Sequence, residues 1–494
     1  MSRRNVALAT AVLGGVIATA WWSMPASSTA ARQSSAGSSQ AAAPCAPPQV
    51  TTRSDKNSGA IDYVAHPRIR PLGSLRAIML FVDFPDAPAT ESTSALYNAL
   101  VPAAQTWFSA SSYGRMSLTV KPVDAWLRLP RSSTTYISNA HPSFDLQREL
   151  LQDAVNAADP TVDFAGYQLL YVVASWPSGV DYSPGFTPVS SAFGVSADGN
   201  TLLNGSVLGG DIRDAYPGAA AATLAHETIH TFGLPDLWHF GNTYPSSMDF
   251  VGGWSLMSSK VNFPGLLAWE RLQLGWLDLS EIAWITTPEQ KDVVLEPLEE
   301  PGGTKAAIVQ TSPTTFVVAE VREPKAEDGR VCDTGVVIYR VDARVEDGMG
   351  ALRVQPAVPD DGSQAVINCS LYYRAAYRPD RVSTFVTADG HVRFEVLAQL
   401  PTGFQVRVTC SAPACAGEPP PPPAKPKCLV PNVVGRLLAT AKGRIGRAHC
   451  LVGAVTHRPS AKSKANRVLR ESPTAGKRLK YHARVRLLVG RHRG

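Results

Sequence analysis

The sequence predicts an α+β domain, followed by a β-sandwich domain and a small α/β domain. Apolar strand-like runs alternate with helix-like segments between residues 75 and 285. From about residue 287, short β-rich runs separated by turn residues replace this pattern, as is typical of a sandwich. A proline run at 419–423 then leads into a basic C-terminal segment. The chain of 494 residues is long enough for two or three domains that each bury a core.

The first domain, residues 75–285, is expected to mix strands and helices, because apolar runs of both lengths are present. Strands are expected at 77–84, near 116–128 and at 168–174, and helices are expected to end at Phe108 and to span 145–157. A further helix is expected at about 219–232, where four consecutive alanines are strong helix formers. Gly233 can adopt the positive φ that ends a helix, and Pro235 cannot continue one.

The second domain, residues 286–412, is predicted from six short β-rich runs, at 293–295, 306–310, 316–321, 335–341, 392–396 and 404–408. No cluster of aromatic residues stands out among these runs. Structural support of the first domain is therefore the favoured role, and substrate or glycan binding is the alternative.

The segment His226-Glu227-Thr228-Ile229-His230 carries the most specific chemistry in the chain. Two histidines four residues apart lie on the same face of a helix, so both can reach one metal ion. The glutamate between them can act as general base for a water activated by that ion. The pattern therefore predicts a zinc peptidase site with His226 and His230 as ligands and Glu227 as base. The competing interpretation is a helix whose histidines bind nothing.

A catalytic zinc ion has three protein ligands, so a third is needed. Asp236 is favoured, because the helix should break after Phe232 and the chain should then turn back toward the metal. His239 is an alternative, since it lies nearby in the chain and imidazole is a common zinc ligand. Glu270, in a later helix-like stretch, is another, although a solvated helix position is its more ordinary role.

Two further features of the site are expected. Met257, in the tight loop at 252–258, is the candidate for a methionine that packs beneath the metal, with Met248 as competitor and an ordinary core methionine as the plain alternative. Tyr244 and His239 are candidates for the donor that stabilises the oxyanion. The acids that could hold a structural calcium ion match no calcium-binding loop and are more simply solvated: Asp159, Asp163, Asp211 and Asp214.

These motifs together resemble the immune inhibitor A-type secreted zinc metallopeptidases. The resemblance rests on HETIHTFGLPDLW at 226–238, GGWSLMS at 252–258 and PGLLAWERLQLGWL at 264–277, and it extends over about residues 75–345. It implies a zincin-like fold and a secreted endopeptidase that hydrolyses proteins or peptides. It also implies His226, His230 and Asp236 as zinc ligands and Glu227 as base. A catalytically inactive wall-binding homologue and a purely structural surface protein are the alternatives.

Residues 428–490 form the predicted third domain, which follows a Pro-rich linker at 413–427. Between Cys428 and Gly494 there are 16 Lys and Arg residues and one acid, Glu471, so this segment carries +15 while the whole chain carries +6. The segments VPNVVG at 430–435 and SPTAG at 472–476 resemble a PASTA module, which implies one helix on a three-stranded sheet and binding to peptidoglycan. The charge itself favours anionic wall polymers as partners. A specific nucleic-acid partner is not expected, because no reading motif accompanies the charge, and a merely solubilising tail is the plain alternative.

The N-terminal residues indicate export. Residues 1–30 have basic residues, an apolar run and then small residues, as in a signal peptide, and no later segment is apolar enough to span a bilayer. Residues 31–74 are rich in Ser, Ala and Pro and are expected to be a disordered leader. Seven cysteines fit an oxidising compartment. Proximity suggests the pairs Cys332–Cys369, Cys410–Cys415 and Cys428–Cys450. Cys45 is left over, as an unpaired or intermolecular thiol rather than a cap on the zinc of a latent form.

Overall fold

The computed structural model describes residues 57–61, 63, 68–136, 144–176, 185–186, 195–198, 200–202, 205–209, 218–240, 242, 246–359, 369, 372–411, 428–448, 450–480 and 483–491. The expected signal peptide and Pro-rich linker lie outside these residues. So do five residues singled out by the sequence: Cys45, Asp211, Asp214, Tyr244 and Cys415.

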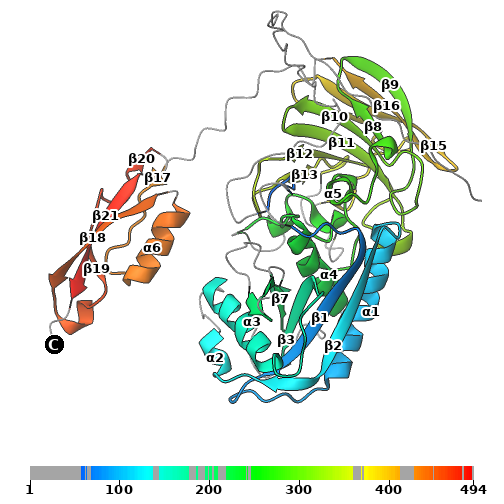
Figure 1. The fold of residues 1–494 in the computed structure, drawn as a ribbon. Helices are drawn as coiled ribbons and strands as arrows, with labels where there is room; N and C mark the ends of the chain where they lie inside the picture. The colour runs from blue at the N-terminus through cyan, green and yellow to red at the C-terminus, as the bar shows by residue number, and fades with distance from the viewer. Residues whose placement is uncertain are drawn as a thin grey trace, which may run out of the picture. The chain divides into compact units, whose positions relative to one another are not determined.

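A five-stranded mixed sheet organises the first part of the chain (Figure 1). Its strand order is β2-β1-β3-β7-β4, where the first four strands run parallel and β4 runs antiparallel to β7. The bounds are Gly73–Asp83 for β1, Met116–Arg128 for β2, Leu169–Ala174 for β3, Gly185–Phe186 for β4 and Gly205–Leu208 for β7. A separate two-stranded ribbon is formed by β5 (Val195–Ala197) and β6 (Asn200–Leu202).

Helices cover both faces of this sheet, and strand β1 shows why. Its residues Met79 and Phe81 belong to one buried cluster, together with α1 (Thr93–Ser111) and α4 (Ala219–Phe232). The alternating residues Leu80 and Val82 belong to a second cluster with α3 (Phe144–Ala158). Because successive side chains of a strand point to opposite faces, a strand covered on both sides is apolar throughout. A short helix α2 (Ser133–Tyr136) precedes α3. The helices and strands expected in this part are confirmed, with small differences at their ends.

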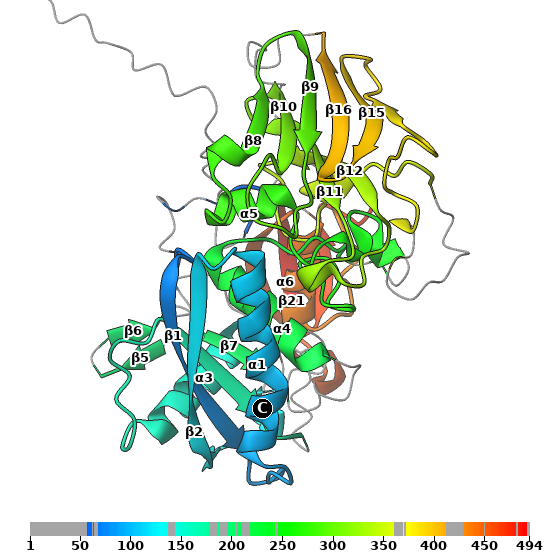
Figure 2. The same ribbon diagram turned by 90° about the vertical axis from the view of Figure 1, so that its right-hand side faces the viewer.

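Two further sheets pack face to face in the second part of the chain, as expected of a sandwich (Figure 2). One has the order β13-β12-β11-β10-β8 and the other β14-β15-β16-β9. Their bounds are Ile282–Ile285 (β8), Glu289–Leu295 (β9), Ala306–Ser312 (β10), Thr315–Arg322 (β11), Gly335–Asp342 (β12), Leu352–Val354 (β13), Thr384–Val386 (β14), Val392–Leu400 (β15) and Gly403–Cys410 (β16). All six predicted β-rich runs are strands. The first sheet also includes β8, all of which lies before residue 286, where the second domain was predicted to begin.

The five-stranded sheet of this sandwich is buried on both faces. On β11, Val317 and Ala319 face the other sheet, whereas Phe316 and Val318 join the core of the first part. Trp269 of α5 (Ala268–Leu274) packs on Phe316, with 4.6 Å between ring centroids. The sandwich and the first part therefore share a continuous apolar interface. Short 3₁₀ helices lie in the connections: η4 (Ser246–Met248), η5 (Gly252–Trp254), η6 (Leu279–Glu281) and η7 (Ala326–Asp328).

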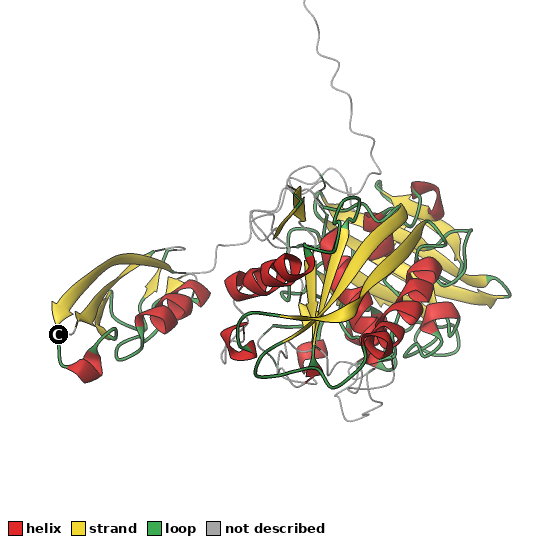
Figure 3. Cartoon of the chain, turned by 60° about the horizontal axis from the view of Figure 1, so that its bottom comes forward, coloured by secondary structure: helices red, strands yellow, loops and turns green. Residues whose placement is uncertain are grey.

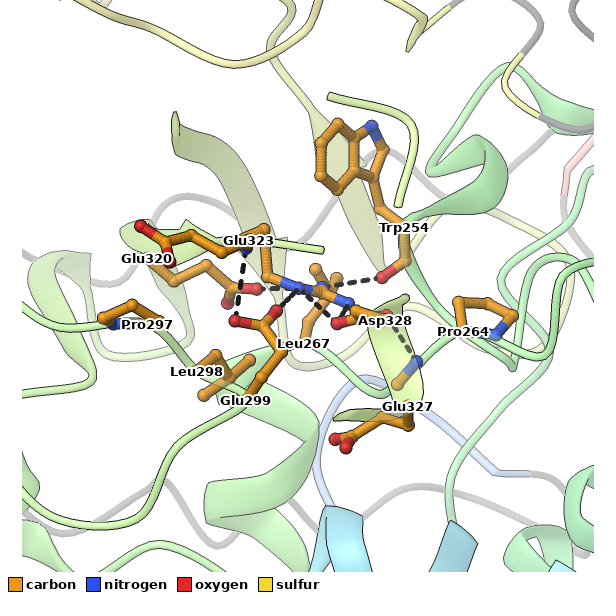
Figure 4. Close-up of polar contacts among 12 residues, drawn as sticks. Trp254, Pro264, Leu267, Pro297, Leu298, Glu299, Glu320, Glu323, Glu327 and Asp328 are labelled. Atoms are coloured by element: carbon orange, nitrogen blue, oxygen red, sulfur yellow. Dashed lines mark hydrogen bonds and ion pairs between the residues drawn. The ribbon is translucent and has the colours of Figure 1, made fainter. Parts of the chain in front are cut away.

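A buried charge network lies where these two parts meet (Figure 4). The Arg322 guanidinium donates to Glu299 at 3.0 Å, to Glu320 at 3.2 Å and to Asp328. It also donates to the carbonyl oxygen of Trp254 at 2.9 Å. Charges withdrawn from water need such partners, because a lone buried ion is very costly. The network therefore fixes the loop around Trp254 to strand β11.

The C-terminal residues form a helix and a small sheet (Figure 3). Helix α6 (Leu438–Arg447) contributes Ala441 and Ile445 to a buried cluster with Val485 and Leu487 of strand β21 (Arg484–Arg491). The three-stranded sheet has the order β18-β21-β19, and β17 pairs with β20. The remaining bounds are Cys428–Leu429 (β17), Leu451–Pro459 (β18), Lys462–Lys464 (η10), Val468–Ser472 (β19) and Arg478–Leu479 (β20).

Among the described cysteines, two disulfides form, Cys332–Cys369 and Cys428–Cys450, as predicted. The third predicted pair is not tested, because Cys415 lies outside the described residues. Every helix within the described part of the chain is too short or too polar to cross a bilayer.

The leader prediction is wrong for residues 57–61, which we expected to be disordered. All five are buried, and the segment bonds to the rest of the chain through Trp269, whose Nε1 donates to the Gly59 carbonyl at 2.8 Å. A Cβ at Gly59 would lie 2.6 Å from the Asp342 carbonyl oxygen, so only glycine fits this close approach. Composition alone suggested a solvated leader, but these few residues are fixed by contacts to distant parts of the chain.

Candidate metal centre

Helix α4 presents the two histidines of the motif side by side. All of its residues from Ala219 to Phe232 are buried, and the helix ends at Gly233, which has a φ of 112°. A side chain on Gly233 would also meet Ile61, because a Cβ there would lie 2.8 Å from the Ile61 side chain. The ring centroids of His226 and His230 are 4.7 Å apart. The predicted helix and its predicted end are both confirmed.

The chain reverses after Gly233 and brings Asp236 to the same place. Asp236 Oδ1 lies 3.1 Å from Nε2 of His226 and 3.5 Å from Nε2 of His230. The two Nε2 atoms are 3.1 Å apart. Among the described residues, these three form the group whose His, Cys, Asp and Glu atoms are placed to share a metal ion.

Backbone carbonyls fix the orientation of both imidazoles. His226 Nδ1 lies 3.0 Å from the Leu256 carbonyl oxygen, and His230 Nδ1 lies 2.9 Å from that of Leu234. Because a carbonyl oxygen only accepts, each Nδ1 carries a proton and each Nε2 faces the group. This is the usual arrangement around a histidine that binds a metal. Two Nε2 atoms only 3.1 Å apart need a proton or a metal ion between them.

The donor set fits zinc in size and in charge. A point equidistant from three atoms with these separations lies roughly 1.9 Å from each, close to the Zn–N and Zn–O distances of about 2.0–2.2 Å. Asp236 Oδ1 is buried and accepts no hydrogen bond of normal geometry from the described residues. Burial lowers the pKa of His230, but Asp236, Glu227 and Asp347 together outweigh burial and raise this pKa to about 10. The group thus favours a positive charge at its centre.

Glu227 follows the first histidine and is buried. Its carboxylate is close enough to His230 to raise the pKa of that imidazole by electrostatic attraction. A buried carboxylate beside a metal group is the type of residue that can accept a proton from a water molecule held there. The sequence alone identified this residue by its place in the motif.

The alternative third ligands are engaged elsewhere. Glu270 accepts hydrogen bonds from the Ser255 hydroxyl and from the Leu267 N–H, both at 2.8 Å, and so caps helix α5. Burial raises the pKa of Glu270 to about 7. His239 Nδ1 lies 3.0 Å from Asp249, and its ring stacks on Phe250. Neither belongs to the group that could share an ion.

The loop at 252–258 bonds to one histidine of the metal group and to the residue that follows Asp236. Leu256 accepts from His226, as described above, and the next carbonyl, of Met257, accepts from the Leu237 N–H at 2.8 Å. Met257 itself is fully buried. This position agrees with a packing role next to the site, and Met248 is linked instead to Ser258, whose hydroxyl lies 3.9 Å from its sulfur.

No calcium site appears among the described acids. Asp163 accepts from the Ala165 N–H at 2.8 Å, and neither it nor Asp159 belongs to a potential metal group within the described residues. Sequence reasoning also missed two residues that contact the site, Asn57 and Asp347. Both lie far from the motif in the chain, and no local pattern distinguishes them.

Comparison with protein-family models finds no match, and comparison with curated proteins finds none either. What can be stated of this chain therefore rests on its own residues: a mixed α/β fold with several sheets, and two histidines and an aspartate that could hold a metal ion.

Proposed function

We propose that this protein is a secreted zinc-dependent endopeptidase. The observation that carries the proposal is the convergence of His226 Nε2, His230 Nε2 and Asp236 Oδ1, with Glu227 beside them on the same helix. Three protein ligands of this type, with a fourth position left for water or substrate, are characteristic of catalytic rather than structural zinc. The resemblance of the motif to immune inhibitor A-type peptidases, which implies a zincin-like fold, supports the same assignment.

Each residue of the site would have a distinct role in metal binding or peptide hydrolysis. His226, His230 and Asp236 would hold the ion, and the Leu256 and Leu234 carbonyls would keep the two imidazoles in the correct tautomer. Bound zinc supplies Lewis acidity, which polarises a peptide carbonyl and makes a water molecule more acidic. Glu227 would take the proton from that water and pass it to the departing amine. Met257 would pack beneath the site.

The variant Glu227→Gln tests the proposal, because it keeps the shape of the side chain and removes its basicity. We expect unchanged zinc content and a loss of casein cleavage of about 10²–10⁴-fold. Glu395→Gln, on strand β15, is the matched control and should cleave at the parent rate. Full activity of Glu227→Gln would show that another group is the base. A parent protein that binds zinc and cleaves nothing would favour the inactive homologue, and one that purifies without zinc would favour a structural protein.

The C-terminal residues are proposed to bind anionic wall polymers or peptidoglycan. On β21, Arg484 and Arg486 are exposed and alternate with buried Val485 and Leu487, so they lie on the sheet face away from the buried cluster. The segment's single acid, Glu471, is buried and accepts the N–H groups of Val433 and Ala475. The Glu471 carboxylate is therefore occupied by backbone N–H groups, and the exposed face of the sheet that carries Arg484 and Arg486 is cationic. A helix beside a three-stranded sheet agrees with the PASTA resemblance.

Sedimentation of the full chain with insoluble wall fragments tests this second proposal. Arg484→Gln/Arg486→Gln should reduce binding, and added salt should reduce binding of the parent, because exposed charges are screened. Lys442→Gln/Arg444→Gln, on helix α6, removes the same charge from another element and should have the smaller effect. Equal loss in both double variants would point to net charge alone. The two disulfides and the expected signal peptide support a location outside the cytoplasm.

A further inference from the structure

We propose that Asp347, on a hairpin of the sandwich, is a positioning residue for the metal group, and that it works together with Asn57. The inference rests on the proposed metal site and extends it to residues outside the motif. The hairpin connects β12 and β13, and its residues 345–350 reach the turn that follows helix α4.

Both peptide groups of Asp236 are held by this hairpin. The Asp236 N–H donates to Asp347 Oδ1 at 2.9 Å, and the Asp236 carbonyl oxygen accepts from the Gly348 N–H at 3.1 Å. The Gly348 carbonyl accepts in turn from the Phe240 N–H at 3.1 Å. With its backbone fixed on both sides, Asp236 has only its side-chain torsions left to place Oδ1 between the imidazoles.

Gly348 is required for this close approach. Its φ of 64° is rarely adopted by residues with a side chain, and a Cβ there would lie 2.1 Å from the ring of Phe240. Glycine at this position therefore lets the hairpin tip lie against Phe240 while its backbone bonds to Asp236 and Phe240. A hairpin that touched this turn only loosely would have room for a side chain at residue 348.

Asn57 joins the same assembly from the other side of the turn. Its amide nitrogen donates to the carbonyl oxygens of His230 at 3.1 Å and Leu234 at 2.7 Å. The Leu234 carbonyl is the one that also accepts from His230 Nδ1. The backbone carbonyl oxygen of Asn57 accepts a hydrogen bond from the Asp347 N–H at 3.2 Å. One chain of hydrogen bonds thus links the orientation of a histidine ligand to the residue that holds the aspartate ligand.

The charge of Asp347 acts on the group as well. Its Oδ1 lies 2.9 Å from the backbone nitrogen of Asp236, so it places a negative charge beside the metal group. Such a charge favours a divalent cation there. Asp347 therefore has two separable contributions: a hydrogen bond that orients Asp236 and a charge that attracts the ion.

Zinc affinity, measured by competition with a chromophoric chelator on the full chain, tests the proposal. Asp347→Ala should weaken zinc binding about 10–100-fold, the usual effect of losing a residue that orients a ligand. Asp347→Asn should recover most of that loss, because its amide oxygen can still accept the Asp236 N–H. Arg344→Gln is the matched control, since Arg344 lies on the same hairpin and pairs with Asp342. It should bind zinc like the parent.

Unfolding temperatures measured with and without zinc separate positioning from folding. Asp347→Ala should lose part of the stabilisation by zinc, while its metal-free unfolding temperature stays close to that of Arg344→Gln. Parent-like zinc affinity in Asp347→Ala would overturn the proposal. Equal weakening in the Ala and Asn variants would also overturn it, because charge alone would then act. The measurement does not depend on proteolysis: a parent that binds zinc without cleaving protein would sink only the peptidase assignment.

Discussion

Glu270 makes the stability of the protein depend on pH in a way that one substitution should remove. Its carboxyl is fully buried and caps helix α5, and its Oε1 accepts no hydrogen bond from the described residues. Burial is the largest cause that raises its pKa, from 4.5 to about 7, and the nearby Glu320 raises it further. The folded protein therefore holds this proton more tightly than the unfolded chain does.

The sign and size of the effect follow from that difference. An acid with a raised pKa in the folded state stabilises the fold fully below its unfolded pKa, and this stabilisation is lost as pH rises through the folded pKa. A shift of this size corresponds to about 3 kcal/mol, of which about 2 kcal/mol falls between pH 5 and 8. Glu270→Gln keeps an oxygen that can accept from Ser255 and Leu267, and it cannot ionise.

Urea unfolding at pH 5 and pH 8, with a chelator present throughout, measures the effect. The parent should lose about 2 kcal/mol more than Glu270→Gln between these pH values. Buried acids that do not interact with Glu270 contribute equally to both proteins, so the difference reports Glu270 together with its coupling to Glu320. Asp292→Asn is the control: its pairing with Arg407 lowers the pKa of this exposed carboxyl, so its titration lies below the range. If parent and Glu270→Gln lose equal stability, the carboxyl is not titrating as argued.

Three further outcomes are expected. Arg322→Met leaves Glu299, Glu320 and Asp328 without their shared cation and should cost about 3–5 kcal/mol of unfolding free energy in urea titrations; a cost below that of an exposed ion pair would contradict the burial argument. Cys332→Ser opens a loop of 37 residues and should cost about 4 kcal/mol by the same assay, and no difference between oxidised and reduced parent would exclude a stabilising disulfide. Zinc at a hundred times its dissociation constant should stabilise the parent by about 2.7 kcal/mol in thermal unfolding, whereas a His230→Ala protein should gain little.

Local sequence signals predicted helix α4, which carries the two histidines, correctly. The alanines before His226 favour a helix, Gly233 can take its terminal positive φ, and Pro235 prevents continuation, so both ends of α4 were predicted. The apolar run at 77–84 likewise predicted a strand, which is β1. Such features depend on residues that are neighbours in the chain, where propensity and periodicity act directly.

Contacts between distant segments could not be predicted in the same way. Asn57 donates to His230 across 173 residues, and Asp347 accepts from Asp236 across 111 residues. Asn and Asp are also ordinary loop residues, so nothing in their local setting separates a solvated side chain from a buried one. Glu270 shows the same limit, because its burial depends on helix α5 packing against strand β11 of the sandwich.

The hairpin at 345–350 has a consequence for the order of synthesis. A growing chain that has reached residue 285 already contains both histidines, Asp236 and Glu227, yet the atoms that hold the Asp236 peptide have not been made. The arrangement described above is thus complete only after about 60 further residues, up to Gly348, have been added. A growing polypeptide would therefore contain both histidines and the aspartate for some time before they could be held in place, which would separate synthesis of the proposed peptidase from the onset of its activity.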